Sequence, residues 1–281
     1  MKHIKEFETY LKVDKELASH TCSAYMRDLK EFGEFSRVNS EEKIDRSHVR
    51  GFLSFLSEKM NQPITRRRKL TSVRMFFRFL EDEKYIKDNP TKGLPSPRVE
   101  DKEPSFLTEG EIKKLMMTVE KSGSERDMAI IRILVETGIR LNELAKLNVS
   151  DLDTDNKTIK VKRKGNKEQT IPINIKLNVL LRSFIKERQP IEPLIVSSFK
   201  KRMSNRRLGM LVKGYLQMSG ISRNVSCHSI RHSFCTRMLE KGADLKTIQI
   251  LAGHSTISTT EKYLHIANPR LRKEVVLAQI N

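Results

Sequence analysis

The sequence predicts a mainly α-helical protein of two domains with one small β-hairpin, and three observations lead to this fold class. Apolar residues recur at helical spacing along most of the 281 residues. A stretch with several prolines, residues 90–104, interrupts that pattern and cannot continue a helix. Two short β-like segments flank a basic turn within residues 158–174. The length is sufficient for two domains that each bury a core.

The first domain is predicted to span residues 1–89 and to contain four amphipathic helices. In the last of them the arginines mostly lie off the apolar stripe, so this helix can pack on one face and present charge on another. Asn89-Pro90 then begins a linker that we place at residues 90–104. The four apolar stripes are Ile4, Phe7, Tyr10 and Leu11; Tyr25, Leu29, Phe32 and Phe35; Val49, Phe52, Leu53 and Leu56; and Leu70, Val73, Phe76, Phe77 and Leu80.

The second domain is predicted to span residues 105–281. Thr108 is placed to cap a first helix, with Glu111 as its capping-box partner, and a second helical pattern ends at Thr137-Gly138. Strands over 158–162 and 169–174 are joined by a basic turn at 163–167. Further helices are expected at 176–188, 204–219, 228–241, 244–252 and 258–266, followed after Asn268-Pro269 by an amphipathic tail helix at about 270–280.

The charge balance points to a polyanionic partner. The formal net charge is +19 and the sequence pI is about 9.9. Most of the excess lies in residues 156–281, whereas residues 99–155 are net acidic. The absence of a long apolar run disfavours a membrane span or secretion, and three cysteines are too few for a disulfide framework, so we expect a cytoplasmic protein.

Lys and Arg gather in several clusters with few acids nearby. Such clusters are typical of binding to a nucleic-acid backbone, although any one of them can also be a solvated surface that keeps the protein soluble. The candidate DNA-backbone contacts are Arg66, Arg67, Arg68, Lys69, Arg74, Lys162, Lys167, Lys200, Lys201, Arg202, Arg206 and Arg207.

Three short motifs carry candidate catalytic side chains. Arg140 stands in TGIRLNEL, just after a glycine bend and at the start of a helix. His228 and Arg231 stand in HSIRH at i and i+3, on one helical face. His254 follows a glycine, and Tyr263 comes nine residues later in a helical stretch. Each motif alone is weak, because surface His and Arg residues are common.

Taken together, these motifs resemble the tyrosine site-specific recombinases of the phage-integrase family, and within it the Xer group. The resemblance spans nearly the whole chain and rests on TGIRLNEL, the hairpin KGNK, HSIRH and LAGHSTISTTEKYLHI. It implies a helical, SAM-like core-binding domain and an α/β catalytic domain that form a C-shaped clamp around DNA. All six catalytic positions of the family carry the expected residue type in the expected order: Arg140, Lys164, His228, Arg231, His254 and Tyr263.

The resemblance implies a reaction in which the Tyr263 hydroxyl attacks a DNA phosphate and forms a 3′-phosphotyrosine. Arg140 and Arg231 would bind the non-bridging oxygens as charge builds up in the transition state. His228 would accept the tyrosine proton, because a hydroxyl of pKa about 10 is a poor nucleophile at neutral pH. No metal, ATP or other cofactor is expected, since the covalent bond keeps the energy of the broken one.

The resemblance also assigns supporting roles. Lys164, on the hairpin, would donate a proton to the departing 5′-oxygen, although Lys167 is close enough in sequence to compete for that role. His254 would donate a hydrogen bond to the phosphate. Glu143, about one turn after Arg140, is expected to orient the site from outside the phosphate contacts.

The expected partner is a double-stranded DNA recombination site, bound by a homotetramer on DNA in a nucleoid-associated location. The tail helix would dock onto a neighbouring protomer, with packing onto its own domain as the alternative. The expected task is resolution of chromosome or plasmid dimers through a Holliday junction. Integration or inversion of a mobile element, a type IB topoisomerase and a non-cutting DNA-binding relative stay open, as does a second recombinase.

A zinc site is an alternative interpretation of one helical segment. His228, His232 and Cys235 share a helical face at i, i+4 and i+7. No CxxC or HExxH pattern accompanies them, so a buried cysteine is the simpler interpretation.

Overall fold

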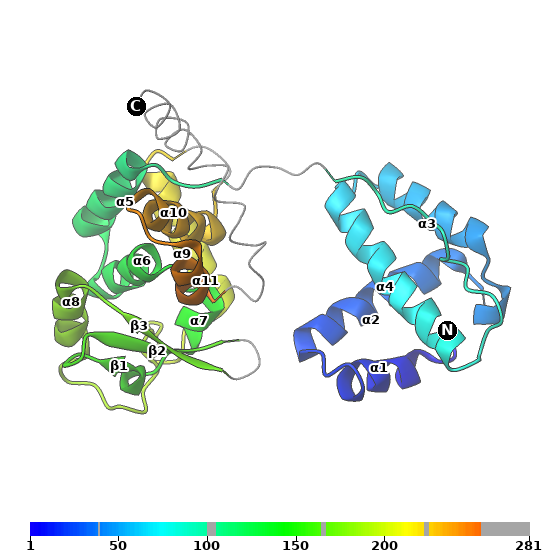
Figure 1. The fold of residues 1–281 in the computed structure, drawn as a ribbon, viewed down its shortest axis with the longest axis horizontal. Coiled ribbons are helices and arrows are strands. Elements are labelled where there is room, and N and C mark those ends of the chain that lie inside the picture. The colour runs from blue at the N-terminus through cyan, green and yellow to red at the C-terminus, as the bar shows by residue number, and fades with distance from the viewer. Residues whose placement is uncertain (39, 100–104, 164–166, 222–224, 254–281) are drawn as a thin grey trace, which may run out of the picture. The chain divides into compact units, whose positions relative to one another are not determined.

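The structure is a computed structural model that describes residues 1–38, 40–99, 105–163, 167–221 and 225–253. The chain divides into two compact units, residues 1–102 and residues 103–281 (Figure 1). The expected helices at 258–266 and 270–280 lie outside the described residues. In the part of the chain that is described, no helix is long and apolar enough to cross a bilayer.

The first unit contains the four predicted α-helices, which are therefore confirmed. A single 3-10 turn, Glu41–Lys43, separates the second helix from the third. Pro63 occupies the first turn of the last helix, where a missing backbone N–H costs nothing. The helices are α1 (Ile4–Val13), α2 (Ser19–Ser36), α3 (Arg46–Glu58) and α4 (Pro63–Asp82).

Aromatic rings fill the core of this unit. Phe7 of α1 meets Phe76 of α4 edge to face, with ring centroids 5.2 Å apart. Phe32 of α2 meets Phe52 of α3 in the same way at 5.1 Å. All four rings are fully buried, and they belong to the apolar stripes that the sequence predicts.

The second unit is mainly helical with one small antiparallel sheet of order β1-β2-β3. Thr108 and Glu111 form the predicted capping box at the start of the first helix. The elements are α5 (Glu109–Ser122), α6 (Glu125–Thr137), α7 (Leu141–Lys146), η2 (Val149–Asp151), β1 (Leu152–Asp153), β2 (Thr158–Lys162), β3 (Glu168–Pro172), α8 (Ile175–Ile185), α9 (Asn205–Met218), α10 (Cys227–Glu240) and α11 (Leu245–Ala252).

The predicted hairpin is confirmed, with two differences. A short third strand, β1, pairs with β2. The last strand ends at Pro172 and not at Asn174, because the Asn174 side chain accepts a hydrogen bond from the Leu177 N–H (2.9 Å) and caps α8. The ladder between β2 and β3 runs as far as the pair Lys162 and Glu168.

Helix α6 lies at the centre of the second unit and contacts α5, α7, α8 and α10 (Figure 1). It ends at Thr137, and Gly138 follows in the left-handed region with φ of +63°. A Cβ at Gly138 would lie 2.4 Å from the ring of Phe234 on α10, so α6 and α10 approach closely only because this residue is glycine.

We predict that Gly138→Ala lowers the free energy of unfolding by about 2–5 kcal/mol, because it adds left-handed strain to overpacking against Phe234. Gly214→Ala is the matched control: Gly214 lies inside α9 with open space at its Cβ, and alanine should stabilise the helix by about 0.5–1 kcal/mol. Urea denaturation of both variants measures the difference, and equal effects would contradict this account.

Candidate active site and nucleic-acid interface

The candidate site lies where the start of α7, the helix α10 and the end of α11 come together beside the end of β2 (Figure 1). Arg140 precedes α7, and its backbone N–H donates to Glu143 Oε2 (2.7 Å) while its Nη1 donates to Oε1 (2.9 Å). A backbone turn and an ion pair therefore fix the direction of the Arg140 side chain. This guanidinium is still 39% exposed and can meet a ligand.

Glu143 is shared with a second arginine. Arg163, at the end of β2, donates from Nη1 to Glu143 Oε2 (2.5 Å). Both side chains are covered, at 8% exposed for Arg163 and 7% for Glu143. Burial alone raises the pKa of Glu143, but the N–H of Arg140 and the charge of Arg163 outweigh it and lower this pKa. The carboxylate is thus held in its charged form.

Arg231, on α10, is the most deeply buried cation of the site at 5% exposed. Its Nη1 donates to the Gly138 carbonyl (2.8 Å), and its Nη2 donates to the Ala252 carbonyl. Burial, with the nearby charge of Arg140, lowers the pKa of Arg231 to about 10. None of the ion pairs within the described residues includes Arg231.

The end of α11 collects donors from four other positions. The last carbonyls of a helix lack partners within the helix and carry its negative partial charge. Here each of four successive carbonyls accepts from a different side chain: Ile250 from Gln169 (2.7 Å), Leu251 from Arg163 (2.8 Å), Ala252 from Arg231, and Gly253 from Arg140 (2.9 Å).

This arrangement concentrates positive charge. Three guanidiniums lie in one hydrogen-bonded network with a single carboxylate, and two of the three are buried. Carbonyl dipoles satisfy their N–H groups but do not neutralise their charge. A site of this kind favours an anion with several oxygen acceptors, such as a phosphate diester.

The structure brings together some of the predicted site residues and leaves others outside its description. Arg140, Glu143 and Arg231 share the network described above. His228 is exposed on the first turn of α10, where its backbone N–H donates to Ser226 Oγ (3.2 Å), three residues before Arg231. Lys164, His254 and Tyr263 lie outside the described residues, although Lys164 directly follows Arg163 and His254 directly follows Gly253 in the chain.

Sequence reasoning missed Arg163 and Gln169. Arg163 Nε donates to Gln169 Oε1 (2.9 Å), and both side chains bind the end of α11. In the sequence, Arg163 stands inside a basic run and looks like another solvated charge. In the observed register Gln169 lies opposite Val161, so Arg163 is its diagonal neighbour on the same face of the hairpin, and the sequence alone does not fix that register.

In the first unit, two candidate DNA contacts on α4 are engaged with α2. Lys69 is buried and paired with Glu31, so its ammonium is part of the packing of the helices. This corrects the expectation that Lys69 contacts DNA. Arg68 pairs with the buried carboxylate of Asp28 but is half exposed, so it can still reach solvent.

Two further candidates hold their own chain together. Arg74 Nη1 donates to Ser96 Oγ (2.7 Å), in the segment after the first helical domain. Arg202 donates to the carbonyls of Ala145 (2.9 Å) and Leu147 (3.0 Å), next to α7. These bonds give both arginines a structural role, and their contact with DNA stays a prediction.

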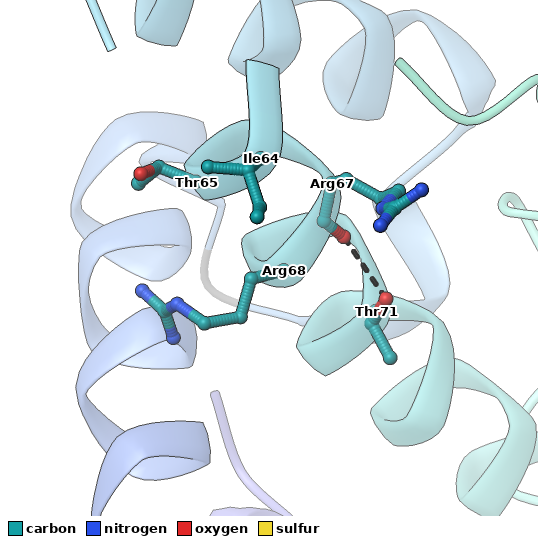
Figure 2. A pocket seen from close by; sticks show the side chains of 5 residues that line it. All are labelled: Ile64, Thr65, Arg67, Arg68 and Thr71. Atoms are coloured by element: carbon teal, nitrogen blue, oxygen red, sulfur yellow. Dashed lines mark hydrogen bonds between the residues drawn. The ribbon is translucent and has the colours of Figure 1, made fainter. Parts of the chain in front are cut away.

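The other candidates are open to solvent, apart from Arg66, which is half-buried. One face of α4 carries a hollow of about 300 Å³ lined by Ile64, Thr65, Arg67, Arg68 and Thr71. Figure 2 shows the side chains of Arg67 and Arg68 extending away from each other beside it. The exposed candidates are Arg67, Lys162, Lys167, Lys200, Lys201, Arg206 and Arg207.

No group of three or more His, Cys, Asp or Glu side chains within the described ranges is placed to hold a metal ion, and those ranges include His228, His232 and Cys235.

The two units match two known domain families in the same order. Residues 4–84 match the N-terminal SAM-like domain of phage integrases, and residues 105–270 match the phage integrase family. The chain therefore belongs to the phage integrase family and is a tyrosine recombinase, an enzyme that breaks and rejoins DNA strands. The family resemblance and the mainly helical fold with a small sheet are confirmed.

Within the family, the similarity is to Xer recombinases. The chain is 35% identical to tyrosine recombinase XerC of Thermodesulfovibrio yellowstonii over 94% of this chain and 91% of that one. It is 30% identical to XerD of Oceanobacillus iheyensis over 96% and 95% of the two chains. Among solved structures, XerH bound to palindromic difH substrate matches with a TM-score of 0.77 at 23% identity, covering 98% of this chain and 85% of that one. A lambda integrase dimer bound to a COC′ core site matches at 0.76 and 18% identity, covering 91% and 95%.

We predict that Glu143→Gln destabilises the second unit at neutral pH by about 3 kcal/mol or more, because it leaves buried guanidiniums without their carboxylate. The pKa of Glu143 is lowered from 4.5, so its stabilisation is fully present above pH 4.5 and is lost as the pH falls through the lowered value. The difference between wild type and variant should therefore shrink on acidification.

Denaturant unfolding at successively lower pH measures this difference. Glu168→Gln is the control. Glu168 is half exposed, and its ion pair with Lys160 is a weak surface pair with the two charged atoms 3.8 Å apart, so this variant should change stability little at any pH. A Glu143→Gln effect that stays constant down to low pH would contradict a charged Glu143.

Proposed function

We propose that this tyrosine recombinase cuts DNA through Tyr263 and resolves chromosome or plasmid dimers. The observation that supports the proposal most is the buried guanidinium of Arg231, beside the Arg140–Glu143 pair. Among the described residues, its printed hydrogen bonds go to two backbone carbonyls. A scissile phosphate would supply the missing negative charge. The similarity to XerC and XerD over most of the chain supports the dimer-resolution role over integration or inversion of a mobile element.

In the first step, the phenolic oxygen of Tyr263 attacks the phosphorus and its proton passes to His228. Arg140 and Arg231 bind the two non-bridging oxygens, and His254 donates a further hydrogen bond. Their interactions strengthen as the phosphorane-like transition state gathers charge, which is the condition for lowering the barrier.

The bond from phosphorus to the 5′-oxygen breaks as the new bond to Tyr263 forms. Lys164 gives a proton to the departing oxygen, so that a 5′-hydroxyl leaves and not an alkoxide. Rejoining runs in reverse: a 5′-hydroxyl of another strand attacks the phosphotyrosine and returns its proton to Lys164. The bond from phosphorus to Tyr263 breaks, and the phenolic oxygen takes its proton back from His228. One phosphodiester is lost and one is made, so no external energy source is required.

The exposed basic residues bind the DNA duplex. We propose that they contact backbone phosphates. These residues are Arg67 on α4, Lys162 and Lys167 at the hairpin, and Lys200, Lys201, Arg206 and Arg207. Such contacts set the affinity and its steep dependence on salt but carry no sequence information. We propose that the protein works as a homotetramer on nucleoid DNA in the cytoplasm, with the tail of one protomer docked onto its neighbour.

The sharpest test of the reaction is a substrate nicked close to the cleavage position. After cleavage, the short fragment that carries the new 5′-hydroxyl diffuses away and the strand cannot be rejoined. The wild-type chain should accumulate a covalent adduct with the DNA, and Tyr263→Phe should form none. EDTA should not change the adduct yield. Tyr10→Phe is the matched control, because Tyr10 packs on Phe79 with ring centroids 5.0 Å apart in the first unit. If Tyr263→Phe forms as much adduct as the wild type, Tyr263 is not the nucleophile.

Deletion of residues 268–281 tests the proposed docking of the tail. The shortened chain should bind a single half-site with unchanged affinity, because the basic contacts remain. Its cooperative assembly on a full site and its cleavage there should weaken. Gel-shift titrations on half and full sites separate the two effects, and equal assembly by both chains would rule out docking in trans.

A further inference from the structure

Arg163 is hydrogen-bonded throughout its guanidinium group, and the reaction described above gives it no role. All three guanidinium nitrogens donate: Nε to Gln169 (2.9 Å), Nη1 to Glu143 (2.5 Å) and Nη2 to the Leu251 carbonyl (2.8 Å). Its backbone N–H donates to the Lys167 carbonyl (2.7 Å) and closes the hairpin. One residue thus connects β2, β3, α7 and α11.

We propose that Arg163 is a positioning residue: it fixes the base of the β2–β3 hairpin against α7 and α11, and the proton transfer assigned to Lys164 depends on that anchor. This inference rests on the proposed function, which makes Lys164 the general acid. It extends that function by naming what places the acid relative to the phosphate-binding arginines.

The position of Arg163 in the hairpin is suited to this task. The ladder between the strands ends at the pair Lys162 and Glu168. Arg163 is the next residue, and its backbone N–H bond to the Lys167 carbonyl (2.7 Å) is made beyond the last ladder pair. A two-stranded ribbon twists easily beyond its last pair. A buried guanidinium that donates in three fixed directions restrains that twist, whereas a lysine ammonium with its freely rotating donors would restrain it far less.

The contact with Glu143 relates the hairpin to the phosphate site. The same carboxylate holds Arg140 through Oε1 and Arg163 through Oε2. The side chain that is proposed to bind the phosphate and the residue directly before the proposed acid are therefore positioned from one group. A shift of the hairpin has to break a buried ion pair.

The end of α11 is shaped to admit Arg163. A Cβ at Gly253 would lie 2.8 Å from the Arg163 Nε, and Gly253 has a left-handed φ of +62°. Any other residue would push the guanidinium away from the helix end or leave the backbone strained. The chain continues from Gly253 directly to His254, so the residue that anchors the hairpin also packs where the histidine segment begins.

The consequence for the rate follows from the geometry that proton transfer requires. A general acid has to come within about 2.6–3.2 Å of the atom it protonates. A misplacement of about 1 Å can cost about 10²-fold in rate. Loss of Arg163 should therefore impair leaving-group protonation and spare the capture of the phosphate.

The test compares two nicked substrates in single-turnover cleavage: one with the natural 5′-oxygen at the scissile phosphate and one with sulfur in its place. A thiolate leaves without being protonated, so cleavage of the sulfur substrate does not need the acid. Arg163→Met should cleave the oxygen substrate about 10²-fold more slowly than wild type and the sulfur substrate at close to the wild-type rate. Lys164→Ala should show the same pattern.

Two variants frame the result. Arg140→Ala should be slow on both substrates, because a missing phosphate contact is not replaced by a better leaving group. Lys160→Met is the matched control: Lys160 lies exposed on the same strand, three residues earlier, and should cleave both substrates like wild type. The yield of covalent adduct with the sulfur substrate measures the fraction of each protein preparation that is folded and active. If Arg163→Met does not fold, Gln169→Leu removes the partner of Nε and should give the same pattern with a smaller loss.

Arg163→Met that is equally slow on both substrates, or as fast as wild type on the oxygen substrate, would overturn the inference. Absence of an adduct from the wild-type chain on both substrates would overturn the proposed function itself. The two failures are thereby told apart.

Discussion

The carboxylate of Glu143 is the interaction on which the site depends. Its two oxygens accept from the backbone and side chain of Arg140 and from Arg163 in an environment with almost no access to water. Without it, three guanidiniums would face one another in a low-dielectric region, where repulsion is poorly screened. The bend after α6, the start of α7 and the end of β2 all meet at this group, so their relative placement follows from one buried charge.

The remaining excess of positive charge is partly offset by backbone carbonyls at the end of α11. The carbonyls at the end of α11 carry partial negative charge, and Arg140, Arg163 and Arg231 each donate to one of them. These bonds hold the arginines in place without a ligand, so the proposed binding of a phosphate would need little reorganisation. Such preorganised donors are the main source of electrostatic catalysis in acyl and phosphoryl transfer. The lowered pKa of Arg231 shows that the burial still has a cost.

Local patterns in the sequence were enough for much of the fold, and distant contacts were not. The stripe that includes Phe7 and the capping box at Thr108 depend on neighbours within one helix, and both were predicted. Asn174 was assigned to a strand, because a strand residue and a helix cap look alike until the next helix is placed. Lys69 was predicted to contact DNA, and Arg163 was left in a basic run with no assigned role. The carboxylates that pair with them lie 38 and 20 residues away in the chain and no local pattern points to them.

Helix α10 shows why the candidate site could be recognised only by its residue types. Its buried residues lie all around the helix, so the segment has no apolar stripe to mark an inner face. Arg231 points to the end of α11, while Ser229 and Ser233 bond to Ser105 Oγ (2.8 Å) and to the Leu107 N–H (2.6 Å). The segment that begins the second unit is therefore attached to the helix that carries Arg231. Ser229 and Ser233 are both buried, one before and one after Arg231 in the chain, so these two bonds fix the part of α10 that carries the predicted phosphate contact.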